Sequence, residues 1–223
     1  MAFALTTPSP LLILSITIII TTIPSITAVD LPPQPSNGPD FIRASCNATL
    51  YPDICYKSLS RYALAVQRDP AQLARVAVAV SLAKARRMAQ YVSALSHQTN
   101  VGAEPKAVSA LRDCFSTVRD AVDEIRSSLA ELRRMPSAGS ISGTSGPSGA
   151  ADDFRFQMSN VQTWMSAALT NEDTCTDGFD VVADSPVKAG VCDQASKVRK
   201  VTSNALALVN SFAAKVEGEE VLD

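Results

Sequence analysis

The sequence has few of the residues and motifs that enzymes use for catalysis. Its 223 residues include one histidine, His97, so a His-x-x-x-His metal pair is impossible. A Gly-x-Ser-x-Gly nucleophile elbow and a phosphate-binding loop are also missing from the sequence. We therefore expect a protein that is not an enzyme and that uses no metal or cofactor, with His97 at the surface.

The chain also lacks an excess of basic residues. Its formal net charge is -2, whereas a protein that binds a nucleic acid duplex gains most of its affinity from clustered lysine and arginine. The densest basic group is Lys84, Arg86 and Arg87 on one predicted helix, which we interpret as a solvated face. We therefore expect no nucleic acid partner.

Charged side chains are absent from residues 1–28. Residues 11–22 form a continuous run of apolar, threonine and serine residues, which is short for a membrane-spanning helix, and small residues ending at Ala28 follow it. This pattern predicts a signal peptide at 1–28 and a secreted, extracellular protein, with an uncleaved membrane anchor as the alternative. The mature chain would begin with a flexible, proline-rich segment at 29–39 and would not contact the membrane.

Five cysteines are present in this chain. In an exported protein they indicate an oxidising compartment, disulfide bonds and one remaining thiol. The single Asn-x-Ser/Thr sequence starts at Asn47 and predicts a glycosylation site.

Apolar residues recur with helical spacing along the chain, and no segment alternates with the period of a β-strand. Because Pro52 disfavours a helical conformation at Tyr51, residues 41–65 should form a short helical hairpin. Long helices are predicted at 70–97, from Pro105 to Met135, at 153–182 and at 191–216, with Pro186 and Gly190 marking the turn before the last. Residues 137–149, which are mostly Gly, Ser and Pro, should form a disordered linker.

The helix after Pro105 has the most regular apolar pattern in the chain. Its apolar residues alternate steps of three and four, as in bundle helices: Val108, Leu111, Phe115, Val118, Val122, Ile125, Leu129 and Leu132. Four long helices with short or flexible connections form an up-down-up-down bundle. We therefore predict an all-α domain at 40–216, a four-helix bundle with an N-terminal helical hairpin and two disulfides.

Carboxylates occupy the polar side of the same helix. Asp120, Asp123 and Glu124 could serve as an acid/base pair in a catalytic site. They lie opposite the apolar stripe, where solvated charges are far more common than catalytic groups. We interpret them as exposed side chains.

The cysteine spacing restricts the disulfide pairing. On a straight helix the Cα atoms of Cys46 and Cys55 would lie about 13 Å apart, which exceeds the roughly 4.4 to 6.8 Å of a disulfide. They can therefore bond only if the chain reverses at Tyr51-Pro52. Antiparallel packing of the second and third long helices would bring Cys114 and Cys175 to the same level. Cys192 is then left without a partner, and we interpret it as a half-buried free thiol, with an intermolecular bond as the alternative.

Several motifs resemble those of the plant invertase and pectin methylesterase inhibitor family. They are Phe41-Ile42-Arg43-Ala44-Ser45-Cys46, Tyr51-Pro52-Asp53-Ile54-Cys55, and Asp173-Thr174-Cys175-Thr176-Asp177-Gly178-Phe179. Residues 162–170 and 202–208 resemble the pectin methylesterase inhibitor branch in particular. The resemblance extends over nearly the whole predicted mature chain.

This resemblance implies the same fold and disulfide pairing, and it adds a function. The protein would bind pectin methylesterase beside its active-site cleft, in a one-to-one complex in the cell wall, and would block pectin. In such inhibitors the contacts come largely from polar residues on the two helices that the second disulfide joins. The matching positions are Thr117, Asp120, Asp123, Thr174 and Asp177.

Two other functions remain open from the sequence. The first is inhibition of an acid invertase, since inhibitors of that enzyme in the same family can carry a Pro-Lys-Phe motif. This chain has Ser185-Pro186-Val187-Lys188 at the corresponding turn, which favours the esterase. The second is a structural or signalling bundle that binds no enzyme.

Overall fold

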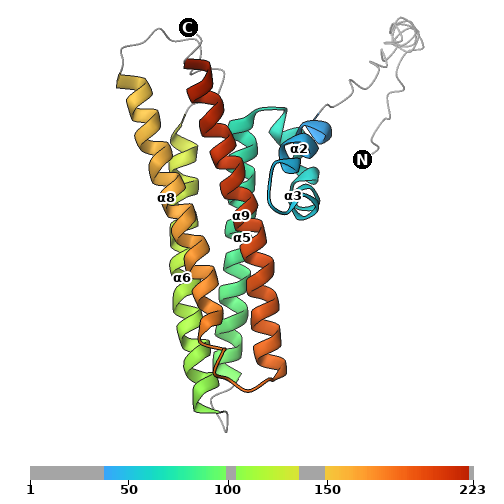
Figure 1. Cartoon of the computed structure of the whole chain (residues 1–223), viewed down its shortest axis with the longest axis vertical. Coiled ribbons are helices and arrows are strands. Elements are labelled where there is room, and N and C mark those ends of the chain that lie inside the picture. Colours follow the sequence, from blue (N-terminus) through green and yellow to red (C-terminus); the bar gives the residue numbers. More distant parts are fainter. Residues whose placement is uncertain (1–37, 99–103, 136–148, 221–223) are drawn as a thin grey trace, which may run out of the picture. The chain divides into compact units, whose positions relative to one another are not determined.

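The computed structural model describes residues 38–98, 104–135 and 149–220. All regular elements in these ranges are helices, and none of the described residues forms a β-strand. Figure 1 shows the four long helices side by side: α5 (Pro70–Gln98), α6 (Pro105–Arg134), α8 (Gly149–Asp177) and α9 (Pro186–Glu220). Each packs against the next along the chain, and α9 also packs against α5. The predicted up-down-up-down four-helix bundle is confirmed.

Three of the long helices begin with a proline, namely Pro70, Pro105 and Pro186. Proline suits the first turn of a helix because its φ is already helical and its missing N–H needs no partner there. Two of these starts also have a side-chain cap. Asp69 Oδ1 accepts a hydrogen bond from the Ala71 N–H at 2.8 Å, and Ser185 Oγ accepts one from the Lys188 N–H at 3.2 Å.

The last helix differs from its prediction, because α9 begins at Pro186 and not near Val191. The sequence interpretation placed Pro186 and Gly190 in a turn, yet Pro186 starts the helix and Gly190 lies inside it. A Cβ atom on Gly190 would lie 2.4 Å from the hydroxyl oxygen of Tyr91 in α5. A larger residue at this position would therefore force the Tyr91 hydroxyl to shift.

Helix α8 is also displaced from its predicted range of 153–182. It begins at Gly149, which belongs to the predicted linker, and it ends at Asp177. Backbone hydrogen bonds of the turn type, from Phe179 N–H to Thr176 O at 3.0 Å and from Val182 N–H to Phe179 O at 3.1 Å, replace its expected last turn. The rest of the predicted linker, residues 137–148, lies outside the described residues.

The predicted helical hairpin is present and consists of α2 (Gly38–Asn47) and α3 (Pro52–Leu59). A disulfide joins Cys46 to Cys55, whose Cα atoms lie 5.5 Å apart, so the chain reverses between them as expected. A short 3-10 helix, η2 (Ser60–Tyr62), and one turn of α-helix, α4 (Ala63–Val66), lead on to α5. Helix α2 includes the last two residues of the segment predicted to be flexible; the predicted signal peptide lies outside the described residues.

A tight turn links α4 to α5 and was not apparent from the sequence. Gln67 and Arg68 have φ angles of 50° and 72°, which lie in the left-handed region that non-glycine residues rarely adopt. The Gln67 N–H donates to the Ala63 carbonyl oxygen at 3.1 Å, which closes the last turn of α4. Neither residue is a typical left-handed helix cap, so sequence reasoning had no signal for this turn.

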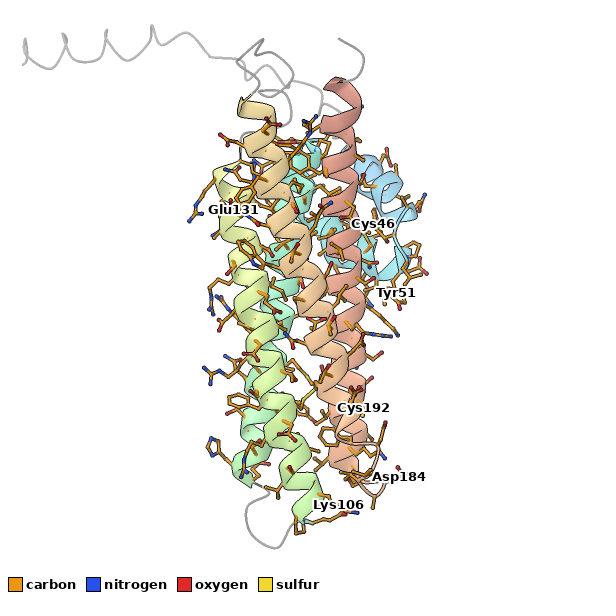
Figure 2. The ribbon with its side chains drawn as sticks, turned by 60° about the vertical axis from the view of Figure 1, so that its left-hand side comes forward. Cys46, Tyr51, Lys106, Glu131, Asp184 and Cys192 are labelled. Carbon is orange, nitrogen blue, oxygen red and sulfur yellow. A yellow bond between two sulfur atoms is a disulfide. The ribbon has the colours of Figure 1, made fainter. Side chains whose placement is uncertain are left out.

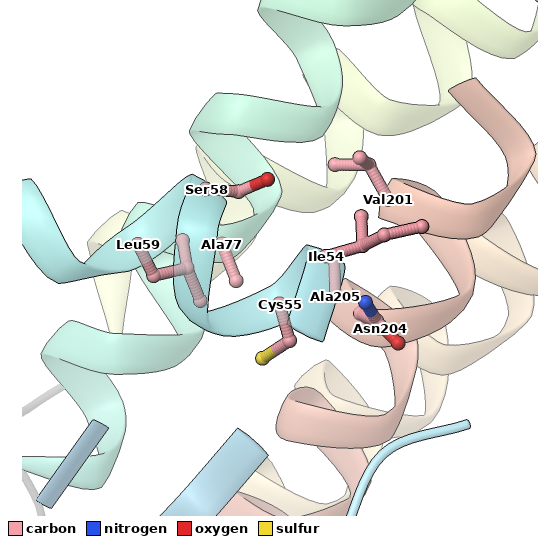
Figure 3. Close-up of a pocket in the computed structure, with 8 residues that line it drawn as sticks. All are labelled: Ile54, Cys55, Ser58, Leu59, Ala77, Val201, Asn204 and Ala205. Atoms are coloured by element: carbon pink, nitrogen blue, oxygen red, sulfur yellow. The ribbon is translucent and has the colours of Figure 1, made fainter. Parts of the chain in front are cut away.

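The hairpin packs against α5 and α9 of the bundle. Figure 2 shows Cys46 and Tyr51 beside α9. The side chain of Asn204 in α9 accepts a hydrogen bond from the Tyr51 N–H at 3.1 Å and donates one to the Tyr51 carbonyl oxygen at 2.9 Å. The same amide lines a cavity of about 10 Å³ between α3 and the bundle, beside Ile54 and Val201 (Figure 3). Asn204 therefore satisfies both backbone groups at the point where the hairpin reverses.

Replacing Asn204 with alanine should destabilise the protein by about 1 to 3 kcal/mol, because the Tyr51 N–H would lose its partner and the Tyr51 carbonyl oxygen would keep only its bond from the Cys55 N–H. Urea unfolding followed by circular dichroism measures this loss. Asn210→Ala is the matched control, since Asn210 lies on the same helix and makes an exposed hydrogen bond to Gln162. Equal losses in the two variants would contradict the proposed docking role of Asn204.

The predicted apolar stripes face the core of the bundle. On α6, six of the eight predicted positions are buried, and Val108 and Phe115 are partly exposed. Near one end of the bundle the rings of Phe154 in α8 and Phe212 in α9 meet edge to face, with centroids 5.6 Å apart. None of the helices in the described ranges is long and apolar enough to cross a membrane.

Candidate functional site

The second disulfide joins Cys114 of α6 to Cys175 of α8, as the antiparallel arrangement predicted. The two Cα atoms lie 3.9 Å apart, so the helices approach closely at this level. One turn further on, a Cβ atom on Gly178 would be 3.4 Å from Ala110, an ordinary contact distance. Cys192 on α9 is free and half-buried, as predicted. The α6–α8 pair is thus fixed covalently at one level.

The five residues that the sequence suggested for partner binding all lie on this pair of helices. Thr117, Asp120 and Asp123 follow one another at steps of three on α6, and Thr174 and Asp177 lie at the end of α8. Thr117 is half-buried, and the other four are exposed. All five side chains are therefore at least partly accessible to a partner.

A hydrogen bond between Glu124 and Asn171 connects the candidate contact residues of α6 with those of α8. Asn171 Nδ2 of α8 donates to Glu124 Oε2 of α6 at 3.0 Å. Asp120 precedes Glu124 by four residues, and Thr174 follows Asn171 by three, so each lies on the same helix face as its neighbour in this bond. The hydrogen bond therefore places the polar rows of α6 and α8 next to each other on one surface.

Asp123 lies further around α6 than the other acidic residues, away from α8. It precedes Glu124 by one residue, which turns its side chain by about 100°. Asp123 also forms an exposed ion pair with Arg126 on its own helix. The structure thus groups Thr117 and Asp120 with the α8 residues more closely than it groups Asp123 with them.

The hydroxyl groups of Thr117 and Thr174 both donate hydrogen bonds to backbone carbonyl oxygens of their own helices. Thr117 Oγ1 donates to the Cys114 carbonyl oxygen at 3.1 Å, and Thr174 Oγ1 donates to the Thr170 carbonyl oxygen at 2.9 Å. Their hydroxyl oxygens, and the exposed carboxylates of Asp120 and Asp177, offer hydrogen-bond acceptors. Such a surface suits a partner that presents arginine, lysine or backbone N–H groups.

Glu124 was interpreted as an exposed, solvated charge, and in the structure it is half-exposed. Partial burial raises the pKa of its carboxyl, the hydrogen bond from Asn171 lowers it, and the nearby Asp120 and Asp123 raise it further. Within the described residues no cluster of three or more His, Cys, Asp or Glu side chains could hold a metal ion. Glu124 is therefore best described as a bridge between α6 and α8.

A second carboxyl, Glu172, was missed by the sequence analysis and lies in the core. It is 2% exposed, and its Oε1 accepts a hydrogen bond from Thr202 Oγ1 at 2.8 Å. The Thr202 hydroxyl is also 2.7 Å from that of Ser81 in α5, so the polar network spans three helices. The other carboxyl oxygen, Oε2, has no partner among the described residues.

The environment of Glu172 favours its neutral form. Burial raises the pKa of Glu172 to about 8, the hydrogen bond from Thr202 lowers it, and Asp173 raises it. The apolar stripe of α8 contained the signal for this position. Ala168 and Cys175 both point into the core, and Glu172, four residues after Ala168 and three before Cys175, lies on the same face of the helix.

Comparison with known proteins identifies a matching family and similar plant proteins. Residues 40–208 match the family described as "Plant invertase/pectin methylesterase inhibitor". A "21 kDa protein" of Daucus carota is 40% identical over 176 residues, which cover 78% of this chain and 84% of that protein. "Pectinesterase inhibitor 11" of Arabidopsis thaliana is 41% identical over 177 residues, which cover 79% of this chain and 82% of that protein.

A solved structure shares the fold. The crystal structure of a mutant form of a pectin methylesterase inhibitor from Arabidopsis superimposes with a TM-score of 0.55 at 20% identity. The superposition covers 74% of this chain and 92% of that one. At this identity the similarity concerns the fold alone.

Proposed function

Because the chain belongs to the plant invertase/pectin methylesterase inhibitor family, we propose that it is a secreted inhibitor of a plant pectin methylesterase. The observation that carries this proposal is 41% identity, over 79% of the chain, to a protein named as a pectinesterase inhibitor. The inhibitor forms a one-to-one complex with the esterase and blocks the cleft that binds pectin. As a member of an inhibitor family, it is not an enzyme.

The surface that meets the esterase is the polar face of α6 and α8. Two features support this choice. The accessible residues Thr117, Asp120, Thr174 and Asp177 lie there, with Asp123 further around α6, and the Cys114–Cys175 disulfide holds the two helices together. A surface that is fixed in advance loses little conformational entropy on binding. Its acceptor groups pair with N–H donors near the esterase cleft.

The predicted signal peptide and the two disulfides support an extracellular location in the cell wall. Asn47 is exposed at the end of α2, so an attached glycan would extend into solvent. The Thr49 hydroxyl donates to the Cys46 carbonyl oxygen at 2.8 Å in the folded chain. We therefore place glycosylation of Asn47 before this turn has folded, while the hydroxyl is still free.

An enzyme assay with two targets tests the proposed function. The secreted protein, purified with its signal peptide removed, is titrated separately into a plant pectin methylesterase and a plant acid invertase. We expect loss of esterase activity with an end point at equal molar amounts, and unchanged invertase activity. Inhibition of the invertase alone, or of neither enzyme, would overturn the proposal.

Replacing Asp120 and Asp123 together with alanine should weaken inhibition of the esterase by at least about tenfold, because truncating one member of a desolvated polar pair typically costs about 2 to 5 kcal/mol. Stability should change by less than about 0.5 kcal/mol, since both residues are exposed. The inhibition constant and the melting temperature check the two parts.

The matched control replaces Asp152 and Asp153, two exposed carboxylates near the other end of α8, with alanine. It removes the same charge and should leave inhibition unchanged. If the control weakens inhibition as much as the Asp120/Asp123 variant does, inhibition depends on the net charge of the protein and not on these two positions. The assignment of the contact surface would then be wrong, even with the family membership intact.

A further inference from the structure

Helix α5 carries an unusual distribution of charge. Its 29 residues include Arg75, Lys84, Arg86 and Arg87, but no aspartate or glutamate. By contrast, α8 contains five acidic residues and one arginine. In the bundle α5 packs mainly against α6 and α9 rather than against α8. The basic character of α5 is thus separated from the acidic character of α8, although the net charge of the chain is only -2.

A hollow lies between α5 and the short helix η2. It has a volume of about 180 Å³, and its walls include Arg61 and Tyr62 of η2 and Lys84 and Arg87 of α5. The α5 residues between these walls have small or branched apolar side chains: Val76, Ala79, Val80 and Ala83. The hollow therefore combines a basic rim with an apolar floor.

A second hollow, of about 490 Å³, lies between α5 and the end of α6. It shares Val76 and Ala79 with the first, and its rim carries Arg75 and Arg133. From Gln72 to Arg87 the two hollows follow α5 for about 22 Å at 1.5 Å per residue. We call this continuous depression the basic groove. The residues that line it include no aspartate or glutamate.

Four of the basic side chains of the groove form no ion pair with a described residue. Arg61 lies over the ring of Tyr62, 4.8 Å from its centroid, and donates to its hydroxyl oxygen at 2.8 Å. Arg75 donates to the carbonyl oxygens of Leu132 and Met135 at the end of α6. These four side chains are Arg61, Lys84, Arg87 and Arg133, and they give the groove a positive potential.

We propose that the basic groove binds a linear polymer of uronic acid, such as pectin from which the methyl esters have been removed. Each sugar of this polymer carries a carboxylate, which arginine binds with two parallel hydrogen bonds and lysine attracts as a point charge. The C–H faces of the sugars pack on Tyr62 and on the apolar floor. The choice of this polymer rests on the proposed function, because pectin methylesterase leaves free carboxylates on pectin.

Two other polyanions fit the groove less well. A nucleic acid duplex needs many phosphate contacts, whereas this groove has five basic side chains in a chain of net charge -2. A membrane surface requires protruding apolar side chains, whereas here the apolar residues form the floor. A flexible, thin chain with one charge per sugar suits a depression that follows a single helix.

The groove also lies apart from the surface proposed to bind the esterase. Its residues come from η2, from α5 and from the C-terminal end of α6, whereas Thr117 and the α8 residues lie near the Cys114–Cys175 disulfide. Leu129, the first α6 residue of the groove, follows Asp123, the nearest proposed contact residue, by about 9 Å of helix and Thr117 by about 18 Å. The inhibitor could therefore hold the product polymer while it occupies the enzyme.

Binding to immobilised polygalacturonate tests this proposal without any esterase, so its result is independent of the inhibition assay. The secreted protein should bind polygalacturonate at low salt and should bind the same polymer after full methyl esterification at least about tenfold more weakly. The affinity should fall steeply as salt rises, because the Debye length shrinks from about 30 Å at 0.01 M to about 8 Å at 0.15 M. Equal binding to the esterified polymer would overturn the proposal.

Matched variants locate the binding site. Arg61→Gln/Lys84→Gln/Arg87→Gln should reduce polygalacturonate affinity at least about tenfold, with melting temperature and esterase inhibition unchanged. Lys106→Gln/Arg112→Gln/Lys197→Gln removes the same charge from exposed positions outside the groove and should retain the affinity. Equal losses in both variants, or tighter binding to dextran sulfate, DNA or anionic vesicles than to polygalacturonate, would overturn it.

Discussion

Replacing Glu172 with glutamine should remove most of the pH dependence of stability between about pH 5 and pH 8 and make the protein more stable than the wild type at the upper end. The expected gain near pH 8 is at most about 4 kcal/mol, since one pKa unit corresponds to about 1.4 kcal/mol. Near pH 5 the two proteins should have similar stability, because the amide resembles the neutral carboxyl.

The direction of this pH dependence follows from the pKa of the Glu172 carboxyl in the unfolded and the folded protein. In the unfolded chain Glu172 has its ordinary pKa of 4.5, whereas burial raises the pKa to about 8 in the folded protein. The folded state therefore binds this proton more tightly than the unfolded state does. The stabilisation is complete below pH 4.5 and is lost as the pH rises through the folded pKa of about 8.

Urea unfolding of both proteins at several pH values measures this difference. Asp152→Asn is a suitable control, because it removes a carboxylate from an exposed position on the same helix and should leave the pH profile of the wild type nearly unchanged. A Glu172→Gln variant with the wild-type profile would show that Glu172 is ionised in the folded protein and that its charge is compensated there.

The sequence predicted the fold well because the fold depends on repeated patterns. The alternation of three and four along α6 predicted its buried face, and proline predicted the starts of α3, α5 and α6. The bounds of α8 and α9 were less accurate. Pro186 was interpreted as a breaker, although it begins a helix when Ser185 caps it, and this distinction depends on local hydrogen bonds.

Polar residues in the core were harder to predict, because their partners are distant in the sequence. Asn204 contacts a residue 153 positions away, and Thr202 contacts Glu172 and Ser81 on two other helices. No local motif signals such pairs. For Glu172 the helical register did indicate burial, but a charged residue in an apolar stripe contradicts the usual interpretation of sequence patterns.

The candidate site could be predicted only in part. The family resemblance supplied five positions on α6 and α8, and the structure places all five at or near the surface. The bridge from Glu124 to Asn171, which brings the two rows together, depends on the relative rotation of the helices. The basic groove depends on the folding of η2 against α5 and could not be predicted from the charges on α5 alone.

Removing the Cys114–Cys175 disulfide by Cys114→Ala/Cys175→Ala should destabilise the protein by about 4 kcal/mol in the chain-entropy model, in which the effect grows with the length of the closed loop. This disulfide spans a sequence separation of 61 residues, compared with 9 for Cys46–Cys55. The matched variant Cys46→Ala/Cys55→Ala should lose less, about 3 kcal/mol in the same model. Urea unfolding under non-reducing conditions measures both losses.

The two variants should also differ in inhibition of the esterase, measured at a temperature at which circular dichroism shows that both are folded. Loss of Cys114–Cys175 frees α6 and α8 to move relative to each other, so the proposed contact residues must be ordered on binding and inhibition should weaken. The Cys46–Cys55 bond lies in the hairpin, which packs on α5 and α9, so its loss should leave inhibition unchanged. Weaker inhibition by the hairpin variant alone would place the esterase contact on the hairpin side of the bundle.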